Sequence, residues 1–314
     1  MVVSSVLIQI LQVLTVVLAA PLLHGFIVKF EERIQRGQGP PVLQPYRDIL
    51  KLLGKEIVVP ETASWVFWTA PVIAFTSMLI VPILIPVLTN YPLPLSDMGD
   101  ILGGGLVLTL GSFAILLAGL DTGQPFGGLG ASRSVMLTIL AEPTLILIFV
   151  GVAFLDHSML PFVANHVLVR NLATYWSPAH LFLVFGFFIL LTVETDRLPI
   201  HSSIHYEVYM IDEARILEYS GPLLAVLKWS SWMKQFILYT IFLNVFLFPW
   251  GLSTSGSLPS LSLAIGFIIL KYGTVAVLMS VVDTIQSRLR FYRYQEPLAL
   301  SFLFAVVALI ANQI

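Results

Sequence analysis

Eight stretches of this 314-residue sequence are long enough and apolar enough to cross a lipid bilayer. A spanning helix needs about 20 mostly apolar residues, since its backbone polar groups must be hydrogen-bonded within the segment. The stretches are residues 2–27, 65–90, 99–120, 135–155, 178–195, 229–250, 258–282 and 297–313. The sequence therefore predicts an all-α polytopic membrane protein with about eight transmembrane helices, organised as a single membrane domain over residues 1–314.

The composition agrees with this class and excludes several others. Hydrophobic residues make up 57% of the chain and charged residues 11%, whereas soluble domains carry about 25% charge. The net charge of −2 offers no basic surface for nucleic acid. The absence of cysteine leaves no thiolate ligands for an iron–sulfur cluster. The histidines fall at unmatched depths, which argues against a haem, and no phosphate-binding glycine loop supports ATP hydrolysis.

The distribution of basic residues predicts the orientation in the membrane. Thirteen lysines and arginines fall in the first, third, fifth and seventh loops, whereas the other loops hold only Arg170. Cytoplasmic loops carry the excess of Lys and Arg in membrane proteins. Both termini are therefore expected outside, with the long first and fifth loops in the cytoplasm.

The fifth loop contains the densest group of carboxylates in the chain. Six of the eighteen acidic residues lie between Glu194 and Gly221. The sequence predicts a short helix over residues 205–219, in which Glu207 and Glu218 share one face. Packed carboxylates of this kind exchange protons. The alternative is a solvated loop held together by ion pairs of Arg215 with its acidic neighbours.

Three further charged residues lie within the apolar stretches. Glu142 precedes Pro143, which cannot supply a backbone donor to the preceding turn. An intramembrane carboxyl is a candidate functional group, and the alternative is a structural glutamate that is protonated or paired with a lysine. Lys271 lies near the middle of the seventh stretch and is expected to need an acidic partner such as Glu142 or Glu194. Lys234 is closer to a helix end, where its side chain can snorkel to the membrane surface.

The first loop contains an amphipathic segment, residues 45–54. Its leucines and isoleucine fall on one side and its charged residues elsewhere. It is either a helix on the lipid surface or a docking site for a soluble protein, and its mixed charge favours docking.

Four stretches, taken in order, resemble the eight-helix membrane subunit shared by respiratory complex I and the group 4 membrane-bound NiFe hydrogenases of the formate hydrogenlyase type. They are Glu32–Glu56, Gly119–Arg133, Ala141–Pro143, and Asp196–Pro199 with Glu218–Gly221. The run Gly39-Pro-Pro-Val-Leu-Gln-Pro-Tyr46 and the run Asp121-Thr-Gly-Gln-Pro-Phe-Gly-Gly128 are similar to the hydrogenase branch. In the fifth loop, His201-Ser-Ser-Ile-His205 replaces part of the acidic run typical of complex I.

The resemblance implies a role as a non-redox subunit of an oxidoreductase complex in the cell inner membrane. The chain would anchor a cytoplasmic redox module and couple its turnover to proton or ion movement. The implied ion path comprises Glu142, Glu194, Glu207, Glu213, Glu218 and Lys271. The implied docking residues are Arg33, Arg36, Gln44, Asp48, Lys51, Asp121 and Arg133.

The resemblance also implies partners and cofactors. No cofactor is expected on this chain. The hydrogenase small and large subunits and further iron–sulfur subunits would hold the iron–sulfur clusters and the NiFe site, and antiporter-like subunits would lie beside the chain in the bilayer. The alternatives are the quinone-site subunit of a complex I-like oxidoreductase, a structural anchor without an ion path, and a free-standing transporter. The residues do not distinguish protons from sodium ions.

Overall fold

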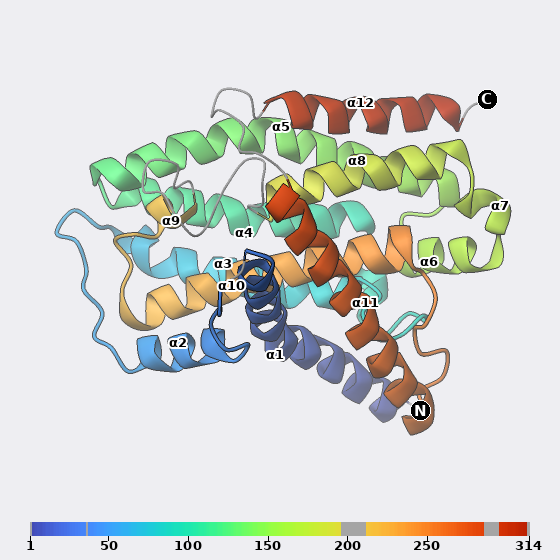
Figure 1. The fold of residues 1–314 in the computed structure, drawn as a ribbon, viewed down its shortest axis with the longest axis horizontal. Helices are drawn as coiled ribbons and strands as arrows, with labels where there is room; N and C mark the ends of the chain where they lie inside the picture. The colour runs from blue at the N-terminus through green and yellow to red at the C-terminus, as the bar shows by residue number, and fades with distance from the viewer. Residues whose placement is uncertain (1, 36, 196–211, 286–294, 313–314) are drawn as a thin grey trace.

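The computed structural model describes residues 2–35, 37–195, 212–285 and 295–312. Within these ranges the chain is helical and forms no β-strand (Figure 1). Each predicted stretch corresponds to one long helix. These helices are α1 (Val2–Ile34), α3 (Trp65–Leu84), α4 (Ile101–Asp121), α5 (Pro125–Asp156), α8 (Pro178–Glu194), α10 (Gly221–Ile241), α11 (Leu258–Ile285) and α12 (Gln295–Ala311).

Several short helices connect the long ones. They are α2 (Gln44–Leu53), η1 (Ser96–Met98), α6 (Pro161–Arg170), α7 (Leu172–Tyr175), α9 (Asp212–Arg215) and the π-helix η3 (Phe242–Leu247), which continues α10. In the described part of the chain, α1, α3, α4, α5 and α11 are long and apolar enough to cross a membrane. The apolar helices α8 and α12 are shorter. The chain is therefore a multi-pass membrane protein, while the exact number of crossings and the side of each terminus stay predictions.

Two long helices begin earlier in the chain than predicted. α5 starts at Pro125 rather than at residue 135 and continues through Pro143. Proline is favoured in the first helical turn, because its missing N–H would have no partner there. α10 starts at Gly221 rather than at residue 229. The expected loop over residues 121–133 is therefore mainly the first turns of α5.

The helices pack around α10, which runs through the middle of the molecule (Figure 1). On one side α12 packs against α8 and α5, and α5 also packs against α4. On the other side α1 packs against α11. α10 itself contacts α1, α2, α3 and α8. Polar side chains on different faces of α10 therefore meet different neighbours.

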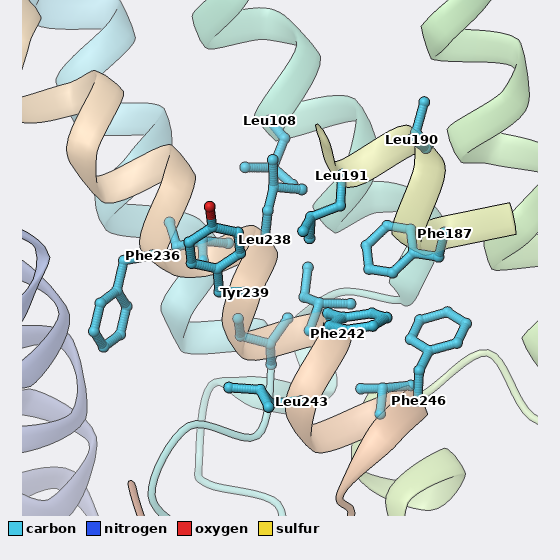
Figure 2. Close-up of a cluster of buried hydrophobic side chains, with 14 of the residues drawn as sticks. Leu108, Phe187, Leu190, Leu191, Phe236, Leu238, Tyr239, Phe242, Leu243 and Phe246 are labelled. Carbon is cyan, nitrogen blue, oxygen red and sulfur yellow. The ribbon is translucent and has the colours of Figure 1, made fainter. Parts of the chain in front are cut away.

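A cluster of aromatic and aliphatic side chains fixes the position of α10 (Figure 2). Phe187 of α8 stacks on Phe246 with ring centroids 4.7 Å apart, and it also contacts Phe242. Leu238, one turn after Lys234, is 1% exposed in the same cluster. Close packing of this kind leaves few alternative arrangements, so the rotation of α10 about its axis is well defined.

Candidate functional site

A polar cavity of about 60 Å³ lies among α4, α5, α8, α9 and α10. It is lined by two carboxylates, two basic groups and several hydroxyl groups in an otherwise apolar helix bundle. These polar lining residues are Thr109, Ser112, Ser134, Thr138, Glu142, Glu194, Arg215 and Lys234. The structure thus brings together Glu142 and Glu194, which are 52 positions apart in the chain and were both predicted in the ion path.

An ion pair between α8 and α10 forms one wall of this cavity. The Nζ atom of Lys234 lies 2.8 Å from Oε2 of Glu194 and donates to Oγ of Ser112 at 3.0 Å. The side chains of Lys234 and Glu194 are 22% and 16% exposed. The interpretation of Lys234 as a snorkelling lysine is therefore wrong, because its ammonium group points into the cavity and is held there by two partners.

Arg215 brings a second positive charge into the cavity from α9, in the segment between α8 and α10. It is buried, and its Nη1 donates to Oγ of Ser134 at 2.8 Å. Burial lowers the pKa of Arg215 to about 10, and the charge of Glu194 opposes that shift. The guanidinium still carries its charge at neutral pH, and it lies against the predicted ion path.

Glycines on α4 and α5 allow α9 to approach this closely. A Cβ atom on Gly130 would lie 2.8 Å from the Cβ of Ala214 and 3.0 Å from the nitrogen of Arg215. A Cβ on Gly119 would lie 3.3 Å from the Cα of Arg215. Small residues permit such close backbone contacts. Gly119 and Gly130 therefore leave the space that α9 occupies, a role that the sequence alone does not reveal.

The cavity combines groups that respond to one another's charge. Glu142 and Glu194 share it with Lys234 and Arg215, so the formal charges of the four ionised groups cancel. Adding a proton to either carboxylate would leave one cation in excess in a confined, mostly apolar space. Charges at such short range strongly bias one another's protonation. The arrangement can therefore link proton binding to movement of Lys234 or Arg215.

Lys271 does not belong to this cavity. Its Nζ donates to Oδ1 of Asn244 at 2.8 Å, whereas Glu194 is paired with Lys234. The expectation of an acidic partner is therefore wrong with respect to Glu194, and the observed partner is an amide. The reason is the packing of α11 against α1, since no α11 residue lines the cavity formed with α4, α5 and α8.

The acidic loop is only partly described. Glu207 lies outside the described residues, and for Glu213 only the backbone position in α9 is given. The predicted helix over residues 205–219 is wrong at its C-terminal end, because α9 ends at Arg215 and residues 216–218 form a turn. Glu218 is half-buried in this turn.

The residues after Glu218 are held by α3 and by the first loop. The ring of Tyr219 stacks on Phe67 with centroids 4.2 Å apart, and its hydroxyl donates to the Phe67 carbonyl at 3.1 Å. Burial raises the pKa of Tyr219, and Asp121 raises it further. The hydroxyl oxygen of Ser220 accepts from the Val58 nitrogen at 2.7 Å. These contacts end the helix earlier than the sequence suggested.

The described docking residues predicted in the first loop lie on α1 and α2. Gln44 donates from Nε2 to Oδ1 of Asp48 at 2.9 Å, an i,i+4 pair within the helix. Arg33 and Lys51 are exposed. Arg36 lies outside the described residues. α2 packs against α1 and α10, and Arg33 lies in the last turn of α1.

Asp121, also predicted to face a partner, has a structural role. Its Oδ2 accepts from the backbone nitrogens of Ser64 at 2.9 Å and Phe67 at 3.1 Å, and its Oδ1 is bonded to the Ser64 hydroxyl. It therefore caps the N-terminus of α3 from another helix. Arg133 lies half-buried in α5. Docking through either residue stays a prediction.

No metal site is found in the parts of the chain that the structure describes. Groups of three or more His, Cys, Asp or Glu side chains that could hold an ion do not occur there. The polar lining of the cavity supplies carboxylate, ammonium, guanidinium and hydroxyl groups.

Fold and cavity together define a polytopic membrane protein with a charged cavity between its helices, and comparison with known proteins identifies its family. The chain belongs to the NADH dehydrogenase family, whose model matches residues 7–313. Formate hydrogenlyase subunit 4 of Escherichia coli is 32% identical over 292 residues, covering 91% of this chain and 92% of that protein. Hydrogenase-4 component C of the same organism is 30% identical over 297 residues, covering 95% and 92%.

A solved structure agrees with the fold. A chain of the membrane-bound sulfane sulfur reductase, an archaeal respiratory membrane complex, superposes with a TM-score of 0.79 at 20% identity. The match covers 97% of this chain and 99% of the other.

Proposed function

We propose that this chain is the membrane-anchoring and ion-coupling subunit of a complex I-like membrane-bound hydrogenase. The observation that carries the proposal is the cavity in which Glu142, Glu194, Lys234 and Arg215 meet. Charged groups inside a membrane protein are costly and usually serve ion or proton movement. The relatives named as subunits of formate hydrogenlyase and hydrogenase-4 support the assignment to a hydrogenase.

In this proposal the chain is a non-redox subunit of an oxidoreductase complex. Hydrogenase small and large subunits bind on the cytoplasmic side and carry the iron–sulfur clusters and the NiFe site. Antiporter-like subunits lie beside the chain in the cell inner membrane. Arg33 at the end of α1 and Lys51 on α2 support docking of the soluble module, since both charged groups are exposed.

The coupling step proposed here is electrostatic. Arg215 sits on α9, at the end of the loop expected to face the redox module, and reaches into the cavity. A displacement of α9 changes the distance between this guanidinium and Glu194. Because a nearby cation favours the ionised form of a carboxyl group, moving it away promotes proton uptake, and its return promotes release. Glu207, Glu213 and Glu218 remain proposed members of the same path on the cytoplasmic side.

The first experiment is to solubilise native membranes gently, isolate this chain and identify the proteins and metals that accompany it. Nickel together with iron–sulfur subunits is the expected result. Iron without nickel would favour the second candidate, a quinone-linked complex I-like oxidoreductase, which the family match also supports. Recovery of the chain without any soluble partner would overturn the proposed function.

The cavity assignment is tested with Glu142→Gln. This substitution keeps the size of the side chain but removes the proton-binding carboxylate, so ion movement per electron transferred should fall several-fold while the complex still assembles. The measurement is ion uptake into sealed membrane vesicles during hydrogen turnover. Glu296→Gln on α12, outside the cavity lining, is the matched control. Unchanged coupling in Glu142→Gln would support a structural anchor instead.

A further inference from the structure

Lys271 and Asn244 form a second buried polar site. They are 5% and 3% exposed, and Nζ of Lys271 donates to Oδ1 of Asn244 at 2.8 Å. The amide nitrogen of Asn244 donates to the Pro86 carbonyl at 2.8 Å, which fixes the orientation of the amide. Its oxygen therefore has to face Lys271, and this oxygen accepts a hydrogen bond from either the charged or the neutral amine.

The backbone around Asn244 is unusual. Asn244 lies in η3, the π-helical continuation of α10, and its carbonyl accepts from Nδ2 of Asn165 at 2.6 Å. The same Nδ2 donates to the Pro249 carbonyl at 2.9 Å. Single π-helical turns are frequent at functional sites. Here the turn brings an amide to a buried lysine and is itself held by a side chain of α6.

Two groups of hydrogen-bonded side chains, together called the polar series, lie between α1 and this site. Nδ1 of His24 lies 3.3 Å from Oε1 of Gln235, whose Nε2 donates to the Tyr239 hydroxyl at 3.2 Å. The next residue, Thr240, is hydrogen-bonded to the hydroxyl of Tyr272, the neighbour of Lys271. From residue 235 to residue 244 the series extends for about 13 Å along the helix.

These groups are separate from the charged cavity. None of His24, Gln235, Tyr239 or Tyr272 lines it, although Gln235 follows Lys234 directly in the chain. Successive residues of a helix point about 100° apart, so α10 presents Lys234 to α4 and α8 and Gln235 to α1. Two polar regions therefore lie on different sides of one helix.

We propose that Lys271 is a second proton-binding site, loaded and unloaded along the polar series from His24. Imidazole, amide and hydroxyl groups each donate and accept hydrogen bonds. One proton adds to the lone pair of the neutral amine and later leaves the ammonium, with no change in redox state. Among the described residues, the titratable groups hydrogen-bonded within the series are His24 on α1, Tyr239 on α10 and Tyr272 on α11.

A buried lysine suits this cycle because its charge is only weakly compensated. In the described ranges the hydrogen-bond partner of its ammonium group is a neutral amide. Burying a cation without a counter-charge is costly, so burial favours loss of the proton from Lys271. Lys234 differs because it is paired with Glu194.

The site is tested with Lys271→Gln and Lys271→Arg in the assembled complex, in sealed vesicles. Gln can still donate to Asn244 but binds no proton, and Arg keeps its charge but does not release its proton. Both variants should lower ion movement per electron several-fold while hydrogen turnover continues. Normal coupling in Lys271→Arg would show that only a fixed charge is needed and would overturn the proposal.

The polar series is tested without altering Lys271. Gln235→Leu removes the link between His24 and Tyr239 and should lower coupling in the same direction. The matched control is Trp229→Phe, which removes another α1–α10 hydrogen bond, from Nε1 to the Val17 carbonyl at 2.9 Å, outside the series. Equal losses of coupling in Gln235→Leu and Trp229→Phe would show that only helix packing is involved, and would overturn the role of the polar series.

The proposal rests on the proposed function, because coupling is its readout. Glu142→Gln, measured in the same vesicles, separates the two. Loss of coupling in Glu142→Gln with normal coupling in Lys271→Gln and Gln235→Leu would overturn only the second site. Normal coupling in Glu142→Gln with loss in both Lys271 variants would support the second site and overturn the role of the acidic cavity.

Discussion

The Glu194–Lys234 ion pair shows how a single contact determines where a charged side chain lies in this protein. Lys234 was considered a snorkelling residue because it lies close to a helix end, yet its ammonium group is bonded to Glu194 and Ser112. Both charged side chains retain some exposure, so the cost of burying them is moderate. The pair is compatible with stability and with exchange of protons through the cavity.

Lys234→Met should therefore destabilise the protein by leaving the Glu194 carboxylate without its cation. Loss of a hydrogen bond to a charged group costs about 1–3 kcal/mol, and the double variant Lys234→Met/Glu194→Gln should recover part of it. Thermal unfolding of the purified protein in detergent measures both effects. Lys228→Met on the same helix should change the unfolding temperature little. Equal unfolding temperatures for Lys234→Met and the wild type would contradict the structural importance of the pair.

At the level of elements, two helix contacts position the cavity. The carboxylate of Asp121 caps α3 from the end of α4, and glycines of α4 and α5 seat α9. Both contacts connect segments that are far apart in the sequence. Residues 119–133, one of the stretches that resemble the family, therefore contribute to folding as well as to any binding of a partner.

Asp121→Ala should weaken the start of α3. Removal of a side-chain cap costs about 0.5–2 kcal/mol, and Asp121→Asn should cost less because an acceptor remains. The control Asp48→Ala removes only the partly buried i,i+4 pair with Gln44, for which a loss of about 0.2–0.5 kcal/mol is expected. Comparable losses in Asp121→Ala and Asp48→Ala, measured by thermal unfolding, would show that the cap contributes little.

Gly130→Ala should push α9 away from α5. The added Cβ would come within 2.8 Å of Ala214, and overpacking of this kind costs about 1–3 kcal/mol. Gly128 is the matched control, since a Cβ there has no neighbour within 4 Å. Gly128→Ala should stabilise the helix by up to about 1 kcal/mol. Similar unfolding temperatures for the two alanine variants would argue against close packing of α9 on Gly130.

For the whole molecule, the distribution of charge predicts the orientation in the membrane and thereby the side on which the proposed redox module would bind. The natural chain has no cysteine, so single cysteines can be introduced without background labelling. Lys51→Cys on α2 should react with a membrane-impermeant thiol reagent only after the cytoplasmic side is exposed. Asn171→Cys, at the end of α6, should react in intact cells or spheroplasts. Labelling of both cysteines from the same side would contradict the predicted topology.

The sequence predicted the long helices because crossing a membrane depends on a local property. Each segment has to satisfy its own backbone and present apolar side chains to lipid, and hydropathy records both. The same reasoning found Glu142 and Glu194, since a carboxylate in an apolar stretch is conspicuous. It placed the ends of helices less well. Pro125 is itself a local signal for the start of α5, whereas the end of α9 at Arg215 accompanies contacts of the following residues with α3 and the first loop.

Only the tertiary structure decided which charged groups meet. Hydropathy does not specify the rotation of a helix about its axis, whereas aromatic packing around Phe187 and Phe246 does so for α10. That rotation directs Lys234 to Glu194 and leaves Lys271 with Asn244. The sequence alone thus determined that this chain lies in the membrane and carries buried charge, while the pairing of the charges arose from distant helices packed in one arrangement.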